Sequence, residues 1–187
     1  MIRMAAKRKP ESSGKPESGT GSSASFAEKL ANAQSLQDIF ELVKETVWKT
    51  LRVDQAGLMV GLAELGIASN GVLGAYYSPE ANTIVMNKTV MAHLKKLANE
   101  QVYKSYCFYI ILHEYLHSCG FYDERENRQI VAAIAAQEFG DSHPVTKLAT
   151  VPEAMISLIK GASAQPPELS DIEFVEGIDR GNTNYIS

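Results

Sequence analysis

The chain has 187 residues, of which 45% are hydrophobic and 21% charged, and its formal net charge is −4. These values are typical of one globular domain, and they exclude a disulfide framework, because there are two cysteines, and a basic surface for nucleic acid, because the central residues carry a small negative charge. No apolar run approaches the ~18 residues that a membrane span needs and no signal-like stretch opens the chain, so we expect a cytoplasmic protein without membrane contact.

The two ends of the chain differ in charge from each other. Residues 1–25 carry five basic and two acidic side chains, whereas residues 161–187 carry five acidic side chains and one arginine. Residues 1–24 are rich in Ser, Gly, Lys and Pro and offer few side chains to a core, so we expect a disordered tail there. Residues 161–187 are predicted to form a loosely held acidic extension. The folded domain is therefore expected over residues 25–160, and the charged tails could bind a protein partner.

Two helix starts open the predicted domain. Ser25 with Glu28 forms a capping box, and Ser35 with Asp38 provides a second start of the same kind. After the second start, apolar residues recur at helical spacing to about residue 50. This pattern predicts an amphipathic helix that backs the rest of the domain.

Short strands follow this helix. The segments 56–62 and 72–78 are apolar and bounded by glycine, which is typical of strands. A turn that contains Pro79 then precedes a third apolar segment, residues 83–87. The last two segments are expected to form a hairpin in a short mixed sheet.

Helices make up the remainder of the predicted domain. Asn87 is placed to cap the first of them, and Gly120 and Gly140 stand where a left-handed residue ends a helix. The expected helices cover residues 88–97, about 101–119, about 124–139 and about 144–160. A backing helix, a short sheet and further helices together indicate a small α+β domain.

The segment HEYLHSCGFYDE, residues 113–124, concentrates side chains that can bind a metal ion. His113 and His117 lie one turn apart on a helix, so both imidazoles can bind one ion, and Glu114 is close enough to reach a water on that ion. Two imidazoles and a third protein ligand suit Zn²⁺ with one open position. Zinc lowers the pKa of a bound water to about 7, and a nearby carboxylate can take its proton. The pattern therefore predicts a catalytic zinc site with Glu114 as the general base.

The stretch HEYLHSCGFYD resembles the HExxHxxGxxD variant of the zincin metallopeptidases, found in the snapalysin-type metzincins. The resemblance implies that His113, His117 and Asp123 bind one Zn²⁺ and that Glu114 is the general base. It also implies a zincin-like fold and an enzyme that hydrolyses peptide bonds in a peptide or protein substrate. A Met-turn, which metzincins have, is not evident after the motif.

The third ligand has alternatives. Asp123 is favoured because Gly120 lets the chain turn back beneath the metal. Glu138 has a spacing that resembles the thermolysin-like gluzincins, and Glu124 is a further possibility at the start of the next helix. His143 could complete a closed, four-ligand site if the metal were structural.

The faces of the predicted helix 101–119 suggest how the site is presented. Tyr106, Ile110, His113 and His117 share one side of the helix, and uniformly apolar residues occupy the other. We therefore expect the histidine side to line a cleft. If the hairpin bordered this cleft, its free backbone groups could bind a peptide as an added strand.

Two other functions compete with the metallopeptidase. The spacing also resembles the bacterial endoribonucleases of ribosomal-RNA maturation, although Asp123 stands where that family has a histidine and Glu114 where it has a glycine. A non-catalytic zinc domain that recruits a partner is the other alternative. Salt-sensitive RNA binding would favour the first, and closed coordination the second.

Overall fold

The fold is described from a computed structural model, which defines residues 24–68, 71–151, 154, 157–159, 162, 164–167 and 171–178. The predicted disordered tail lies outside these residues, apart from Ala24. Within the described ranges, no helix combines the length and the apolar character that crossing a membrane would require.

The two N-terminal helices begin where the capping boxes predict. They are α1 (Phe26–Asn32) and α2 (Leu36–Leu51). In each, the hydroxyl of the N-cap serine, Ser25 or Ser35, accepts a hydrogen bond from the backbone of the third helical residue. The carboxylate of that residue accepts one from the serine N–H, which satisfies two backbone donors at each helix start.

Four strands form one mixed sheet in the order β2-β3-β1-β4. Their bounds are β1 (Met59–Ala63), β2 (Ala75–Ser78), β3 (Thr83–Asn87) and β4 (Glu173–Phe174). The antiparallel pair of β2 and β3 is the expected hairpin, and β1 runs parallel to β3. Strand β2 therefore forms one edge of the sheet and β4 the other.

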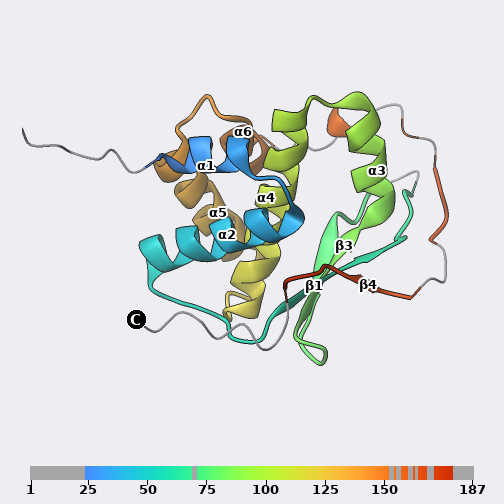
Figure 1. Cartoon of the computed structure of the whole chain (residues 1–187), viewed down its shortest axis with the longest axis horizontal. Coiled ribbons are helices and arrows are strands. Elements are labelled where there is room, and N and C mark those ends of the chain that lie inside the picture. Colours follow the sequence, from blue (N-terminus) through green and yellow to red (C-terminus); the bar gives the residue numbers. More distant parts are fainter. Residues whose placement is uncertain are drawn as a thin grey trace, which may run out of the picture.

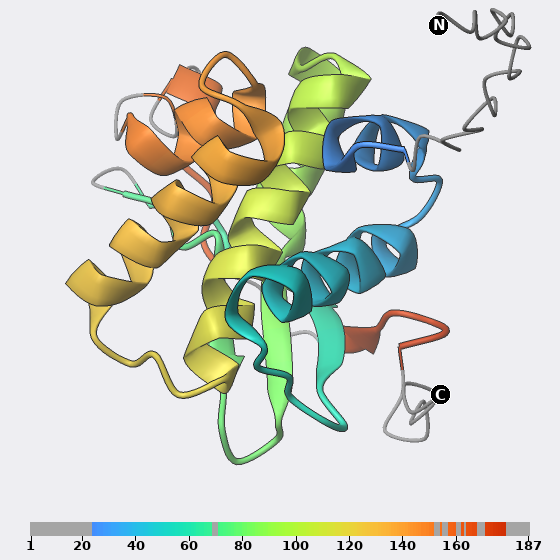
Figure 2. The same ribbon diagram turned by 90° about the vertical axis from the view of Figure 1, so that its left-hand side faces the viewer.

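The remaining helices surround α4. They are α3 (Lys88–Leu97), α4 (Glu100–Ser118), α5 (Glu124–Phe139) and α6 (Pro144–Thr150), and further helical residues occur at 154 and 157–158. Figures 1 and 2 show α4 running between the sheet and the group formed by α1, α2, α5 and α6. Both sides of α4 are buried along most of its length, so this helix is the centre of the core. The molecule is an α+β protein, as the sequence predicts.

The sequence predicts that the histidine side of α4 lines a cleft, but part of this side is covered. Gly74, just before β2, packs so closely on this side that a Cβ there would lie 2.8 Å from Cδ1 of Ile110 and 3.1 Å from the hydroxyl of Tyr106. Both of those side chains are buried. The hairpin thus covers the first part of the histidine side and leaves His113 and His117 half-buried near the end of α4.

In its described part, the acidic extension is packed on the domain rather than loosely held. Gln165 and Ile67 exchange two backbone hydrogen bonds of 2.7 and 2.9 Å. Strand β4 then pairs with β1, and the N–H of Val175 donates to the β1 backbone at 2.9 Å. Ile178, 3% exposed, joins the core, whereas Phe174 stays exposed. The extension closes the edge of the sheet beside β1.

Candidate metal centre

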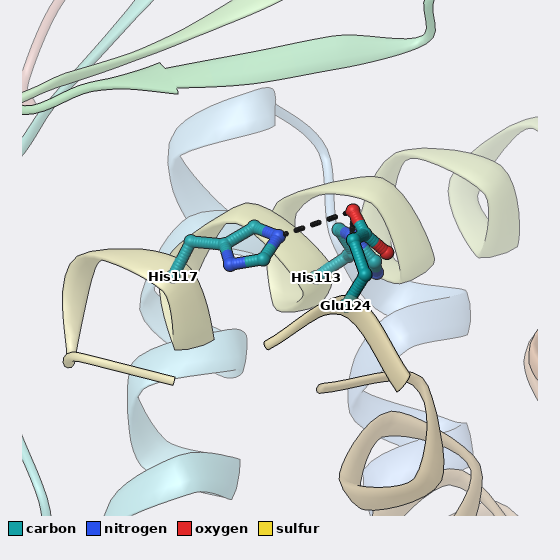
Figure 3. A group of neighbouring side chains, drawn as sticks. All are labelled: His113, His117 and Glu124. Atoms are coloured by element: carbon teal, nitrogen blue, oxygen red, sulfur yellow. Dashed lines mark hydrogen bonds and ion pairs between the residues drawn. The ribbon is translucent and has the colours of Figure 1, made fainter. Parts of the chain in front are cut away.

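Three side chains converge where the end of α4 meets the start of α5 (Figure 3). His113 and His117 project from α4, and Glu124 is the first residue of α5. Nε2 of His113 lies 3.3 Å from Oε1 of Glu124, and Nε2 of His117 lies 3.5 Å from the same oxygen. The three potential ligand atoms are all within 4.8 Å of one another. In the part of the chain that the structure describes, this is the group with the geometry to bind a metal ion.

Two of the three separations between these atoms fit a tetrahedral zinc ion. Bonds of about 2.0–2.1 Å at tetrahedral angles place two zinc ligands about 3.4 Å apart. The separations of 3.3 and 3.5 Å between the Glu124 oxygen and the two imidazole nitrogens agree with this value. The group has no fourth histidine, cysteine or acidic member among the described residues. Three protein ligands are the number that catalytic zinc sites use.

His117 is held in the orientation that metal binding requires. Its Nδ1 lies 2.8 Å from the carbonyl oxygen of Phe121, which can only accept, so Nδ1 carries the proton. Nε2, on the side of Glu124, is therefore the nitrogen left to bind a metal ion. The carbonyl comes back beneath the last turn because Gly120 takes a φ of +100°, which few other residues adopt. The predicted left-handed conformation of Gly120 at the end of this helix is confirmed, whereas the turn does not bring Asp123 to the histidines.

The acidic member of the group is Glu124, whereas the sequence favours its neighbour Asp123. Asp123 is the N-cap of α5, and its carboxylate accepts a hydrogen bond of 2.8 Å from the N–H of Glu126. A cap side chain is directed at its own helix, so it turns away from the histidines. Glu124 lies within the first turn and reaches across to α4, and its second oxygen accepts from Nε of Arg128 at 3.1 Å.

The other two candidate ligands lie elsewhere. Glu138, near the end of α5, forms an ion pair of 2.6 Å with Lys49 on α2. His143 is the N-cap of α6, where Nδ1 accepts a hydrogen bond of 3.2 Å from the N–H of Val145. Its ring packs against Phe139 with 4.9 Å between the centroids. Each of these side chains has a structural role, and neither belongs to the metal-binding group.

Glu114 lies beside the group but is not one of its members. It is 8% exposed, and this burial raises the pKa of its carboxyl to about 7, against the opposing effects of His117 and of the nearby backbone N–H of Tyr77. That N–H belongs to the free edge of β2. The carbonyl of Gly74 accepts a hydrogen bond from the N–H of Asn87 on β3. The backbone N–H and C=O groups of every second residue from Gly74 therefore point to β3, and those of Tyr77 point away from it. The edge of the hairpin therefore reaches the predicted general base.

The electrostatics of the centre favour the protonation states that bind a cation. Burial lowers the pKa of His113, which keeps its imidazole neutral at pH 7. Burial alone would raise the pKa of Glu124, but His113 and Arg128 outweigh it and lower the pKa below its usual range. A neutral imidazole and an ionised carboxylate are the forms in which these side chains bind divalent metals.

The chain matches no protein-family model, no curated protein and no solved structure. The assignment of this centre therefore depends on its own geometry and chemistry.

Proposed function

We propose that the chain is a zinc-dependent metallopeptidase of the zincin type. In this proposal His113, His117 and Glu124 hold one Zn²⁺, and Glu114 is the general base. The observation that carries the proposal is the approach of two imidazole nitrogens to one carboxylate oxygen, at 3.3 and 3.5 Å, beside a second, buried carboxylate. The two cysteines, which are free thiols, support a cytoplasmic setting as part of the same proposal.

The chemistry divides between the ion and the protein. Zinc, when bound, supplies a Lewis acid that activates water and polarises a carbonyl group. Glu114 accepts the proton that the attacking water loses and returns it to the leaving amine. A carboxyl group with a pKa of about 7 suits both steps near neutral pH. The ion pair of Glu124 with Arg128 leaves one carboxylate oxygen directed at the histidines.

The edge of the sheet supports a peptide as the substrate. An extended peptide can add to a free strand edge through backbone hydrogen bonds. Strand β2 is such an edge, and the outward N–H of Tyr77 lies next to Glu114. A peptide paired with β2 would thus have a carbonyl group close to the candidate metal centre.

Substitution of the general base tests this function. The wild-type chain and Glu114→Gln should each bind one equivalent of zinc, measured by metal analysis after purification. Hydrolysis of a quenched fluorescent peptide library should fall by about 10²- to 10⁴-fold in Glu114→Gln, because the amide cannot take a proton. Glu80→Gln is the control, since Glu80 is exposed in the hairpin turn and does not belong to the metal-binding group.

Equal hydrolysis by the wild-type chain and Glu114→Gln would end the proposal. The same preparations separate the alternatives. Cleavage of RNA that is lost in Glu114→Gln would assign a nuclease, and one tightly held zinc without any hydrolysis would assign a structural metal site.

A further inference from the structure

Two buried polar atoms beside the candidate metal centre lack a hydrogen-bond partner among the described residues. They are Nδ1 of His113 and Oδ1 of Asn127. Asn127 lies on α5 one turn after Glu124 and is 0% exposed. Its Nδ2 donates a hydrogen bond of 3.0 Å to the backbone carbonyl of His113. The two residues are thus already joined, and each has one further atom without a partner.

Hydrogen-bond chemistry determines whether each of these two atoms is a donor or an acceptor. A carbonyl oxygen only accepts, so the Asn127 amide must present its NH₂ group to His113 and direct Oδ1 elsewhere. An ionised carboxylate also only accepts, so Nε2 of His113, 3.3 Å from Glu124, carries the single proton of the neutral ring. Nδ1 is then unprotonated. Both atoms are therefore acceptors in the metal-free protein, and neither has a donor among the described residues.

We propose that Asn127 is a positioning residue for His113, and that Oδ1 of Asn127 accepts a hydrogen bond from Nδ1–H of His113 when this histidine binds a metal ion. Nε2 cannot keep its proton once its lone pair binds a cation, so the neutral ring carries the proton on Nδ1. This change of tautomer converts one of the two acceptors into a donor. A single new bond then gives both atoms the partner that they lack.

The proposed bond has the form that orients metal-binding histidines in proteins. The second ring nitrogen of such a histidine donates to a carboxylate, a carbonyl or water, and loss of that partner lowers metal affinity about 10- to 100-fold. His117 already has this arrangement through Phe121. Asn127 would supply it for His113, and its bond to the His113 backbone would hold α5, and hence Glu124, against α4.

Three variants separate positioning from general stability. Asn127→Ala removes both hydrogen bonds, and Asn127→Asp keeps an acceptor for Nδ1–H but loses the NH₂ donor. Val131→Ala is the matched control, because Val131 is equally buried one turn later on α5. Each variant is compared with the wild-type chain in thermal stability with a chelator present, in zinc affinity by competition with a chromophoric chelator, and in the ¹⁵N-histidine NMR spectrum of the zinc form.

In the wild-type zinc form we expect a slowly exchanging Nδ1–H signal from His113. Asn127→Ala should lose this signal and bind zinc about 10- to 100-fold more weakly, and Asn127→Asp should recover the signal and part of the affinity. Val131→Ala should lose stability with unchanged affinity. Zinc affinity and Nδ1–H exchange that are unaltered in Asn127→Ala would overturn the role of Asn127.

This inference rests on the metal binding of the proposed function but not on hydrolysis, and the two can fail separately. A wild-type chain that binds no zinc overturns the proposed function and the inference together. Tight zinc binding by the wild-type chain and by Asn127→Ala alike overturns the inference alone.

Discussion

Asp123 and Glu124 are adjacent carboxylates with different contacts, because one precedes the first turn of α5 and the other lies within it. The cap position holds Asp123 on the N–H of Glu126, and only Glu124 approaches the imidazoles. Aspartate is among the preferred residues at an N-cap, so the capping preference explains why the residue that the family motif favours is the one that turns away.

The two carboxylates can be distinguished by paired amide substitutions. Glu124→Gln should weaken zinc binding by more than about 100-fold, because removal of a ligand exceeds the usual effect of removing its supporting partner. Asp123→Asn should leave zinc affinity unchanged, since asparagine caps a helix as well as aspartate does. Competition with a chromophoric chelator measures both. The reverse order of affinities would return Asp123 as the third ligand.

The turn between α4 and α5 determines the site at the scale of the element. A Cβ on Gly120 would meet no atom within 4 Å, so a side chain would not clash at this position. Other residues are disfavoured there because the backbone has a φ of +100°. The turn positions two groups of the metal centre. It returns the Phe121 carbonyl to His117, and it starts α5 where Glu124 faces α4.

Gly120→Ala should therefore affect both stability and metal binding. We expect the free energy of unfolding to fall by about 1–3 kcal/mol from backbone strain, and zinc affinity to fall because the Phe121 carbonyl is displaced. Gly140→Ala is the control, because Gly140 has a φ of +80° and equally open surroundings at the far end of α5. Chemical denaturation with a chelator present measures the first effect, and chelator competition the second. Equal zinc affinity in both variants would show that the turn does not position His117.

Element boundaries were predictable from the sequence because they depend on local contacts. Ser25, Ser35 and Asn87 each cap the helix that follows them, and α5 has the predicted bounds. Likewise, the spacing of His113 and His117 is set by one turn of helix, so their proximity could be inferred. The choice between two adjacent acids depends on side-chain direction at a cap, which the family motif does not contain.

Contacts between distant segments account for what the sequence did not predict. The packing of Gly74 on Ile110 covers the first part of the histidine side of α4, and no local pattern marks it. Gln165 pairs with Ile67 although nearly 100 residues separate them in the sequence. Gln165 lies in a stretch whose acidic composition is typical of a loose tail. Composition describes a segment alone, whereas its packing depends on the surface that receives it.

At the scale of the whole molecule, the extension is an integral part of the sheet. Gly66 has a φ of +72°, and a Cβ there would lie 2.3 Å from the carbonyl oxygen of Gln165. Because the obstructing atoms are backbone, no side-chain rotation relieves the clash. The extension and the β1 region are therefore fitted to each other by close backbone approach.

Gly66→Ala should loosen the extension without affecting the metal centre. We expect the free energy of unfolding to fall by roughly 1–3 kcal/mol and amide hydrogen exchange at Val175, which donates to β1, to become faster. Zinc affinity should be unchanged, since β4 and β2 are opposite edges of the sheet. Unaltered exchange at Val175 would contradict the packing role of Gly66.

The contact between Tyr77 and Glu114 has a consequence for how a substrate would be received. The N–H of Tyr77 lies near the carboxylate of Glu114 and is also the donor that an added strand would need at this position. An arriving backbone and the acid thus compete for one hydrogen. Under the proposed function, pairing of a peptide with β2 would then withdraw the Tyr77 N–H from Glu114. Substrate binding would thereby free the carboxylate that acts as the base.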